Sequence, residues 1–436
     1  MYKKITNLSN LVKDSYEWRD FLAKISLLSF GIFLWHKELV IVASVLVILT
    51  WILCDGLSHL KSIIREPLMV AILFFCIVLL LGTFWGEIPG PNPSKHEGPY
   101  SPISRQFRWA KYMGLMLFIP YLQLLNKKNL PWAVSGLVVG YLGVLFAGIY
   151  YQFFLGITGI PPLKMLYLHF SAALGVGILL TMYLANSSIN KKVKLSSWGI
   201  GFFLLLLQLN IVGRGPILAT IGTLFLLLFL LHRRRLKKML SLMLVTTICV
   251  MTIAYHSHSF KQRFSEVITE IEQSAEGKNR TSTGERIALL KVGLYAIAQQ
   301  PWFGYGTGMA KQAFKENASI YQNGQYKDVE SYHHLHFHND LIELGVYLGG
   351  FGVAIYIFLL WGWFQTLWMR KLGALGATLV CFIFLGGITD TFLFYQQITF
   401  MLLALTAIVI TSRETKQGDF LLENSLSKPC HDPYKN

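Results

Sequence analysis

The sequence predicts an all-α, polytopic membrane protein with about twelve transmembrane helices. Of the 436 residues, 53% are hydrophobic and only 14% are charged, whereas a soluble domain carries about 25% charged residues. Apolar runs recur along the whole chain, and many reach the length of about 20 residues that a helix needs to cross a bilayer. Basic residues cluster in alternate short connections between these runs, which is the pattern of a chain that crosses the membrane repeatedly.

The apolar runs predict the spans and the organisation of the chain, and the ends of each span are predicted to within a few residues. Residues 1–256 carry the first block of transmembrane helices, 257–339 form a large periplasmic loop, 340–411 carry the last helices, and 412–436 form a cytoplasmic tail. The individual spans are 21–36, 38–54, 67–85, 108–125, 130–154, 166–186, 197–213, 215–232, 239–256, 340–367, 372–389 and 392–411.

The net charge of +16 is explained by membrane topology rather than by nucleic-acid binding. The basic clusters fall on one side of the membrane if the spans alternate, so both termini are expected in the cytoplasm. The run "HRRRLKK" is expected to lie near anionic lipid headgroups. The clearest clusters are Lys191, Lys192 and Lys194, the run Arg233 to Arg235, and Arg370 with Lys371.

The five cysteines are scattered, and no CxxC pattern occurs. This distribution is typical of small apolar residues or isolated thiols, and it favours neither a disulfide framework nor a cysteine zinc site.

Two outer segments are longer than simple turns. The segment 86–107 contains several prolines and glycines, which argue against a regular helix. In the large loop, "FKQRFSEVITEIEQ" has apolar residues at helical spacing, and "STGERIALLKVGLYAIAQ" predicts an amphipathic helix that ends near Gln299, before Pro301. Ser282 and Glu285 match a capping box at its start. The tail after Thr411 is polar and is expected to be irregular.

Arg214 lies in "NIVGRGPILA", between two apolar runs at the predicted outer end of a span pair. One interpretation is an interfacial arginine that reaches lipid headgroups. The other is an anion site, because flanking glycines let backbone N–H groups approach a ligand. Pro216 at the first helical position would then direct a helix N-terminus at the same spot. A guanidinium donates two hydrogen bonds at once, which suits diphosphate.

Arg286 lies in the first turn of the amphipathic loop helix, where a basic residue opposes the helix dipole. It is either an exposed arginine on a polar face or a group held at headgroup height. In the second case it would meet the diphosphate of a lipid-linked substrate.

Four histidines, His333, His334, His336 and His338, crowd the stretch "HHLHFHND". They could hold a metal, since His334, His336 and His338 share a face if the chain is extended, but no HExxH spacing or fourth ligand supports zinc. They could simply line a wet loop. The third interpretation is a general base, because neutral imidazole accepts a hydroxyl proton. His338 is the best candidate, since the next residue, Asn339, begins a rigid span.

Other polar residues carry weaker hypotheses. Arg105, Arg108 and Lys111 lie at the outer mouth of the fourth predicted span, where a solvated or lipid-facing role is favoured over a share in an anion site. Asp390, in "GGITDTF", could orient a histidine, pair an arginine, or be a simple loop carboxylate. Glu343 falls inside the tenth span and needs a partner that the sequence does not identify.

The order of "GRGP", "GERIALL", "PWFGYGTG" and "HFHNDLIELGVYLGG" resembles the O-antigen ligase/polymerase superfamily of bacterial envelope enzymes, over about residues 195–365. The core of the resemblance is the pair His338–Asn339 followed by Gly349. It implies a fold similar to that of GT-C-type membrane glycosyltransferases, with the active site on the periplasmic side of the inner membrane.

The resemblance also implies a chemistry. Arg214 and Arg286 would bind the diphosphate of an undecaprenyl-diphosphate-linked O-antigen donor, and His338 would be the base of an inverting transfer that uses no metal cofactor. The ligase, with a lipid A–core acceptor, is favoured, although ligase and polymerase share this chemistry. A third member of the superfamily, which transfers glycan to protein hydroxyls, is disfavoured because it often has a longer soluble C-terminal part, whereas this chain stops soon after its last span. The polymerase is the first alternative, and an anion or solute transporter is the alternative of another class. We expect a monomer in contact with membrane lipids.

Overall fold

The structure is a computed structural model, and it describes residues 2–59, 65–86, 108–157, 160–163, 165–211, 213–256, 258–327, 329 and 336–426. Within these residues the elements are helices, which confirms the predicted all-α class. In the first half they are α1 (Tyr2–Phe33), α2 (Lys37–Leu53), η1 (Gly56–His59), α4 (Pro67–Leu81), η2 (Met113–Leu117), α6 (Phe118–Leu124), α7 (Leu130–Ile149), η3 (Tyr150–Phe154), α8 (Tyr167–Ser187) and α9 (Lys191–Leu209).

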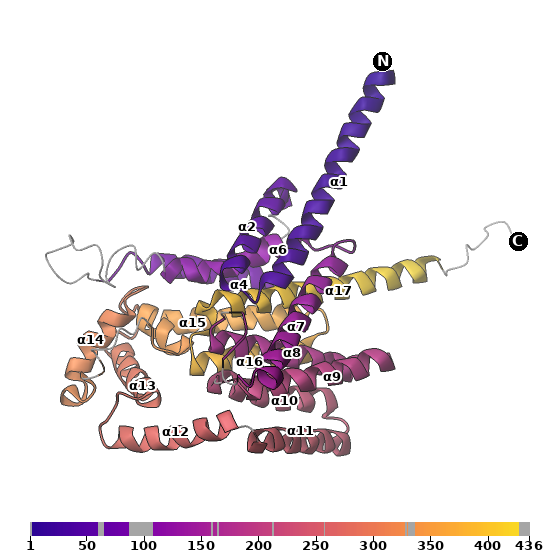
Figure 1. Cartoon of the computed structure of the whole chain (residues 1–436). Coiled ribbons are helices and arrows are strands. Elements are labelled where there is room, and N and C mark those ends of the chain that lie inside the picture. Colours follow the sequence, from indigo (N-terminus) through magenta and orange to yellow (C-terminus); the bar gives the residue numbers. More distant parts are fainter. Residues whose placement is uncertain are drawn as a thin grey trace, which may run out of the picture.

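The second half continues the bundle and inserts the loop helices (Figure 1). Its elements are α10 (Arg214–His232), α11 (Leu236–His256), α12 (His258–Ala275), α13 (Ser282–Gln299), α14 (Ala310–Ile320), η4 (Tyr321–Gly324), α15 (Asp340–Trp368), α16 (Gly373–Thr389), η6 (Phe392–Phe394) and α17 (Gln396–Leu426). The outer segment 87–107 and residues His333 and His334 lie outside the described residues.

The described helices make this a multi-pass membrane protein. Seven of them are long and apolar enough to cross a membrane, and α4 and α16 are shorter apolar helices. Each of the predicted spans falls on helical residues of the structure. The span at 108–125 is broken, because the 3-10 turn η2 interrupts it before α6.

The bundle packs around α8 and α17, whose apolar windows are mostly enclosed, whereas α11 lies at the edge with most of its surface exposed. Helix α8 contacts α9 and α10, and α15 contacts α4 and α16. Helices α1 and α7 approach closely because small residues face each other. A Cβ at Gly136 would lie 2.4 Å from the Leu28 carbonyl oxygen, and one at Gly140 would lie 2.7 Å from the Gly31 carbonyl oxygen. Such small-residue contacts are typical of helix pairs in membranes.

The large loop folds as helices at the end of the bundle where α15 begins. Figure 1 shows α13 and α14 beside that end and the C-terminal part of α17 on the opposite side. Helix α13 packs on α14 and α15. The predicted cap was wrong by one residue. The backbone of Thr281 is extended as an N-cap requires, and its hydroxyl accepts a hydrogen bond from the Gly284 N–H at 3.1 Å.

The polar tail differs from the prediction. It was expected to be irregular after Thr411, but α17 continues through this region to Leu426. The segment contains no proline before Pro429, and extending an existing helix avoids the cost of nucleating a new one.

Helix α15 contains a sharp kink at Gly349, whose φ of 61° and ψ of −145° lie outside the helical region. The kink leaves the carbonyls of Val346 and Tyr347 available to the loop segment "FGYGTG". The N–H groups of Tyr305 and Gly306 donate to these two carbonyls, each at 2.8 Å. The kink therefore allows the loop to hydrogen-bond to α15, the helix that directly follows the histidine stretch.

We predict that Gly349→Ala lowers the stability of the folded protein. Its Cβ would lie 2.5 Å from the Trp302 carbonyl carbon, and a side chain at this backbone conformation costs about 1–3 kcal/mol in strain alone. Thermal unfolding of the purified protein in detergent measures the loss. Gly143→Ala is the matched control, because a Cβ at Gly143 meets nothing within 4 Å. Equal unfolding midpoints for the two variants would contradict the prediction.

Candidate active site

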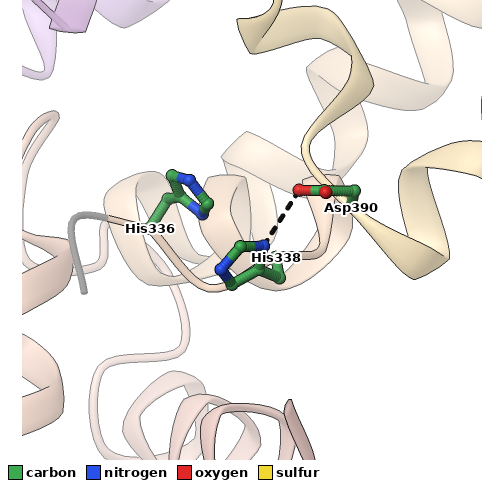
Figure 2. Close-up of side chains that lie close together, drawn as sticks. All are labelled: His336, His338 and Asp390. Atoms are coloured by element: carbon green, nitrogen blue, oxygen red, sulfur yellow. Dashed lines mark hydrogen bonds and ion pairs between the residues drawn. The ribbon is translucent and has the colours of Figure 1, made fainter. Parts of the chain in front are cut away.

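The described end of the histidine stretch brings two imidazoles together. The rings of His336 and His338 lie 4.1 Å apart between centroids, and Figure 2 shows both near Asp390. The segment is not extended as the shared-face prediction assumed, because His338 has a positive φ of 50°. Phe337 between the two histidines is buried against Phe314, so an aromatic ring anchors the segment while both imidazoles remain at the site.

His338 is held between the start of α15 and the end of α16. Asn339, the next residue, caps α15 by accepting a hydrogen bond from the Ile342 N–H at 3.1 Å, and its amide donates to the Ile388 carbonyl at 3.0 Å. His338 itself has a positive φ of 50°, which is rare for a residue other than glycine and is found most often at functional sites. The sequence expectation that a rigid element holds His338 is confirmed.

Asp390 orients the His338 ring. Nδ1 of His338 lies 3.0 Å from Oδ1 of Asp390 (Figure 2). The same oxygen accepts a hydrogen bond from the Thr391 N–H at 2.8 Å and one from the Tyr395 hydroxyl at 3.2 Å. Of the hypotheses for Asp390, the structure therefore favours the one in which it orients a histidine.

The charge state of Asp390 decides which nitrogen of His338 carries the proton. Burial opposes its ionisation, but the hydrogen bond and charge of His338 and the Thr391 N–H outweigh this and lower the pKa of Asp390 to about 2. An ionised carboxylate only accepts hydrogen bonds, so Nδ1 of His338 must donate. In the neutral form of the ring, the lone pair of His338 is therefore on Nε2, which points away from Asp390 in Figure 2.

A buried carboxylate holds the histidine segment from the other side. Glu343 is fully buried, and its Oε2 accepts a hydrogen bond from the Phe337 N–H at 2.7 Å. Its Oε1 accepts a hydrogen bond from the Tyr347 hydroxyl and pairs with Nη1 of Arg108 at 3.4 Å. Arg108 also donates to the Tyr347 hydroxyl at 3.0 Å.

This network corrects the favoured role of Arg108 and supplies the missing partner of Glu343. Arg108 was expected to be solvated or to face lipid, but it is only 4% exposed. The reason is that a buried carboxylate within a membrane needs an opposite charge close by. Arg105 lies outside the described residues.

Arg214 is the first residue of α10, and its guanidinium is paired with two carboxylates of α12. Nη2 lies 3.3 Å from Glu266, and Nη1 lies 3.6 Å from Glu270. Pro216, expected at the first helical position, instead follows two residues later in the first turn. Arg214 therefore lies at a helix N-terminus as expected, although anionic side chains of the loop contact it in this structure.

Two carboxylates of the loop interact with predicted site residues. Glu270 accepts hydrogen bonds from the N–H and hydroxyl of Thr283, at the start of α13, so it links Arg214 to that helix. Glu285, in the same first turn, has a pKa raised by burial, and the charges of His338 and Arg286 act against that rise. Arg286 is half-buried, and its charge, like that of His338, acts to lower the pKa of Glu285.

Several contributors to the site were missed by sequence reasoning. Tyr395 was assigned to the last span, but it precedes α17 and donates to Asp390. His169, on α8, packs against Tyr395 in a tilted arrangement with ring centroids 4.0 Å apart, and its Nδ1 lies 3.0 Å from Oε1 of Gln397. A histidine inside the apolar run 166–186 was the available signal for this contact.

The ligand atoms of His336, His338 and Asp390 all lie within 4.8 Å of one another, so these three side chains could hold a metal ion. The sequence suggested His334, His336 and His338 as metal ligands. His334 lies outside the described residues, and the third possible ligand in the structure is Asp390.

Part of the chain is similar to a known protein family. Residues 199–357 match the family model described as O-Antigen ligase. Over 171 residues the chain is 20% identical to the O-antigen ligase of Escherichia coli (strain K12), and this alignment covers 39% of the chain and 40% of that relative. The resemblance to the O-antigen ligase/polymerase superfamily is thereby confirmed. The region matched by the family model contains Arg214, Arg286 and His338, whereas Arg108 and Asp390 lie outside it.

We predict that Glu343→Leu destabilises the protein because it leaves the Arg108 charge buried without its carboxylate. Breaking one partner of a buried ion pair costs about 3–5 kcal/mol. The double variant Arg108→Met/Glu343→Leu should recover part of this loss, since it removes both charges. Thermal unfolding of wild type, both single variants and the double variant forms the required cycle. A double variant as unstable as the sum of the singles would show that the two charges are not coupled.

Proposed function

We propose that this protein is a membrane glycosyltransferase that ligates an undecaprenyl-diphosphate-linked glycan to a sugar hydroxyl of lipid A–core. The observation that carries the proposal is the pairing of a half-buried histidine with a buried, ionised aspartate, in a chain that matches the O-antigen ligase family over residues 199–357. Such a pair is a means of presenting a neutral imidazole nitrogen to a hydroxyl.

In the proposed reaction His338 is the general base. Its Nε2 takes the proton of the acceptor hydroxyl as the oxygen attacks the anomeric carbon of the donor sugar. The bond from this carbon to the diphosphate oxygen breaks, and the diphosphate leaves with the electron pair. The incoming oxygen approaches opposite the leaving group, so the anomeric configuration inverts. Asp390 is a positioning residue that keeps Nδ1 protonated and stabilises the imidazolium that forms.

Arg214 and Arg286 are proposed to bind the departing diphosphate. A leaving group that departs as an anion needs opposite charge rather than a proton donor, and a donor of this kind contributes about 10²–10³ in rate. Because Glu266 and Glu270 contact Arg214 in this structure, a bound diphosphate must replace these carboxylates at the guanidinium. The proposed step uses no metal cofactor.

The proposed location is the inner membrane, with both termini in the cytoplasm and residues 257–339 on the periplasmic side. The support is the basic clustering of the connections and the placement of α13 and α14 at the end of the bundle away from the C-terminal part of α17. Both lipid-linked substrates would then reach the site from the outer half of the bilayer. The protein is proposed to act as a monomer.

We predict that Asp390→Asn lowers kcat by about 10²–10⁴, close to the loss in His338→Ala. An asparagine amide can donate to Nδ1, which moves the imidazole proton to Nε2 and removes the base. The KM for the donor should change little, because neither side chain binds the diphosphate. Asp390→Glu should recover part of kcat, since it restores a carboxylate. Steady-state transfer assays of the purified variants measure kcat and KM separately. A normal kcat for Asp390→Asn would contradict the positioning role of Asp390.

Acceptor dependence separates the ligase from its alternatives. Purified protein with lipid-linked glycan should form product only when lipid A–core is added, in the presence of a chelator, and not with His338→Ala. Mass spectrometry of the glycolipids detects the products. Longer lipid-linked glycan without lipid A–core would identify a polymerase, and movement of the glycolipid without transfer would identify a transporter. Activity lost in chelator and restored by zinc would show that a metal is required.

A further inference from the structure

The cluster of His336, His338 and Asp390 has the donor set of a transition-metal site. Two imidazoles and one carboxylate are the ligands found around zinc and related divalent metals. Nδ1 of His338 and Oδ1 of Asp390 lie 3.0 Å apart, close to the separation of about 3.3 Å between two ligands of a tetrahedral zinc ion with bonds of about 2.0 Å. The third ligand atom, on His336, is within 4.8 Å of the other two.

The three ligands are also held in place by neighbouring groups. The Tyr395 hydroxyl lies 3.2 Å from Oδ1 of Asp390 and 3.4 Å from Nε2 of His336. The Phe337 N–H bond to Glu343 fixes the backbone between the two histidines. Groups that orient ligands in this way strengthen metal binding. His338 is 22% exposed, which gives an ion a route to the cluster.

We propose that His336, His338 and Asp390 bind a divalent first-row transition metal such as Zn²⁺, and that the bound metal inhibits glycan transfer. Binding rests on the geometry alone, and inhibition rests on the function proposed above. The metal forms one bond to the carboxylate and two bonds to the imidazoles. Any proton carried by a nitrogen that binds the metal is released to solvent.

Inhibition follows from the nitrogen of His338 that faces Asp390, which is Nδ1. A metal at Nδ1 takes the place of the proton there, so that the neutral ring carries its proton on Nε2. This arrangement removes the lone pair that would accept the acceptor's proton. Mg²⁺ and Ca²⁺ prefer oxygen ligands and should not inhibit.

The first test measures zinc binding without substrates, by competition with a chromophoric zinc chelator. The wild-type protein should bind one Zn²⁺ at the cluster, and His336→Gln should weaken this binding at least about 10-fold. His256→Gln is the matched control, because His256 is exposed at the end of α11 and away from the cluster. Binding that is absent in the wild type, or unchanged in His336→Gln, would overturn the site while leaving the base role of His338 untouched.

The second test measures transfer in increasing Zn²⁺, with each variant compared with its own zinc-free rate. Zn²⁺ should inhibit the wild type and His256→Gln equally, chelator should restore the rate, and His336→Gln should need at least about 10-fold more zinc. Binding without inhibition would overturn the inhibitory role. A wild-type enzyme inactive in chelator and activated by zinc would instead overturn the metal-free transfer proposed above.

Discussion

The hydrogen bond from the Phe337 N–H to the buried Glu343 carboxylate sets the position of the whole site. It ties the segment before α15 to the interior of that helix, one turn from its start. The carboxylate is tolerated there because Arg108 and Tyr347 satisfy its other oxygen. A buried charge of this kind is costly unless it is paired and hydrogen-bonded, so the segment can only adopt the arrangement in which all three groups meet. The position of His338 is a consequence of that requirement.

Two further constraints act on the same few residues. Asn339 joins the start of α15 to the end of α16, and Gly349 bends α15 so that the loop pairs with its free carbonyls. Helix α15 is therefore the rigid frame that holds both the histidine segment and the loop in position. Side chains carried by a loop segment need such a frame, because loops alone have few buried contacts to fix a side chain.

Much of the fold was predictable because hydrophobic length and charge are local properties. The spans followed from apolar runs, and α13 followed from its spacing and from Pro301. The proximity of His336 and His338 was expected only for an extended chain, and the structure reaches it with a bend at His338 instead. The continuation of α17 was not predicted, because a polar composition is equally compatible with a surface helix and with a coil.

The chemistry of the site was less predictable because it depends on pairs that are distant in the sequence. In the sequence, Arg108 and Glu343 are charged residues in or beside apolar runs, and neither shows its partner. The structure shows that they pair with each other once α15 is in place. The carboxylates that contact Arg214 come from α12, whose sequence indicated no more than an amphipathic helix. Tyr395 was hidden within an apolar run, where an aromatic residue normally indicates membrane contact rather than a hydrogen bond to a carboxylate.

The side-to-side alternation around Phe337 makes the register of this short segment critical. Phe337 fills the space beside Phe314 while its two neighbours face the site. Inserting or deleting one residue between His336 and Asn339 would bring a benzyl group to the reaction centre and push an imidazole among apolar side chains. Changes in loop length are therefore tolerable only upstream of His336, and the spacing from there to the first turn of α15 is fixed to the residue.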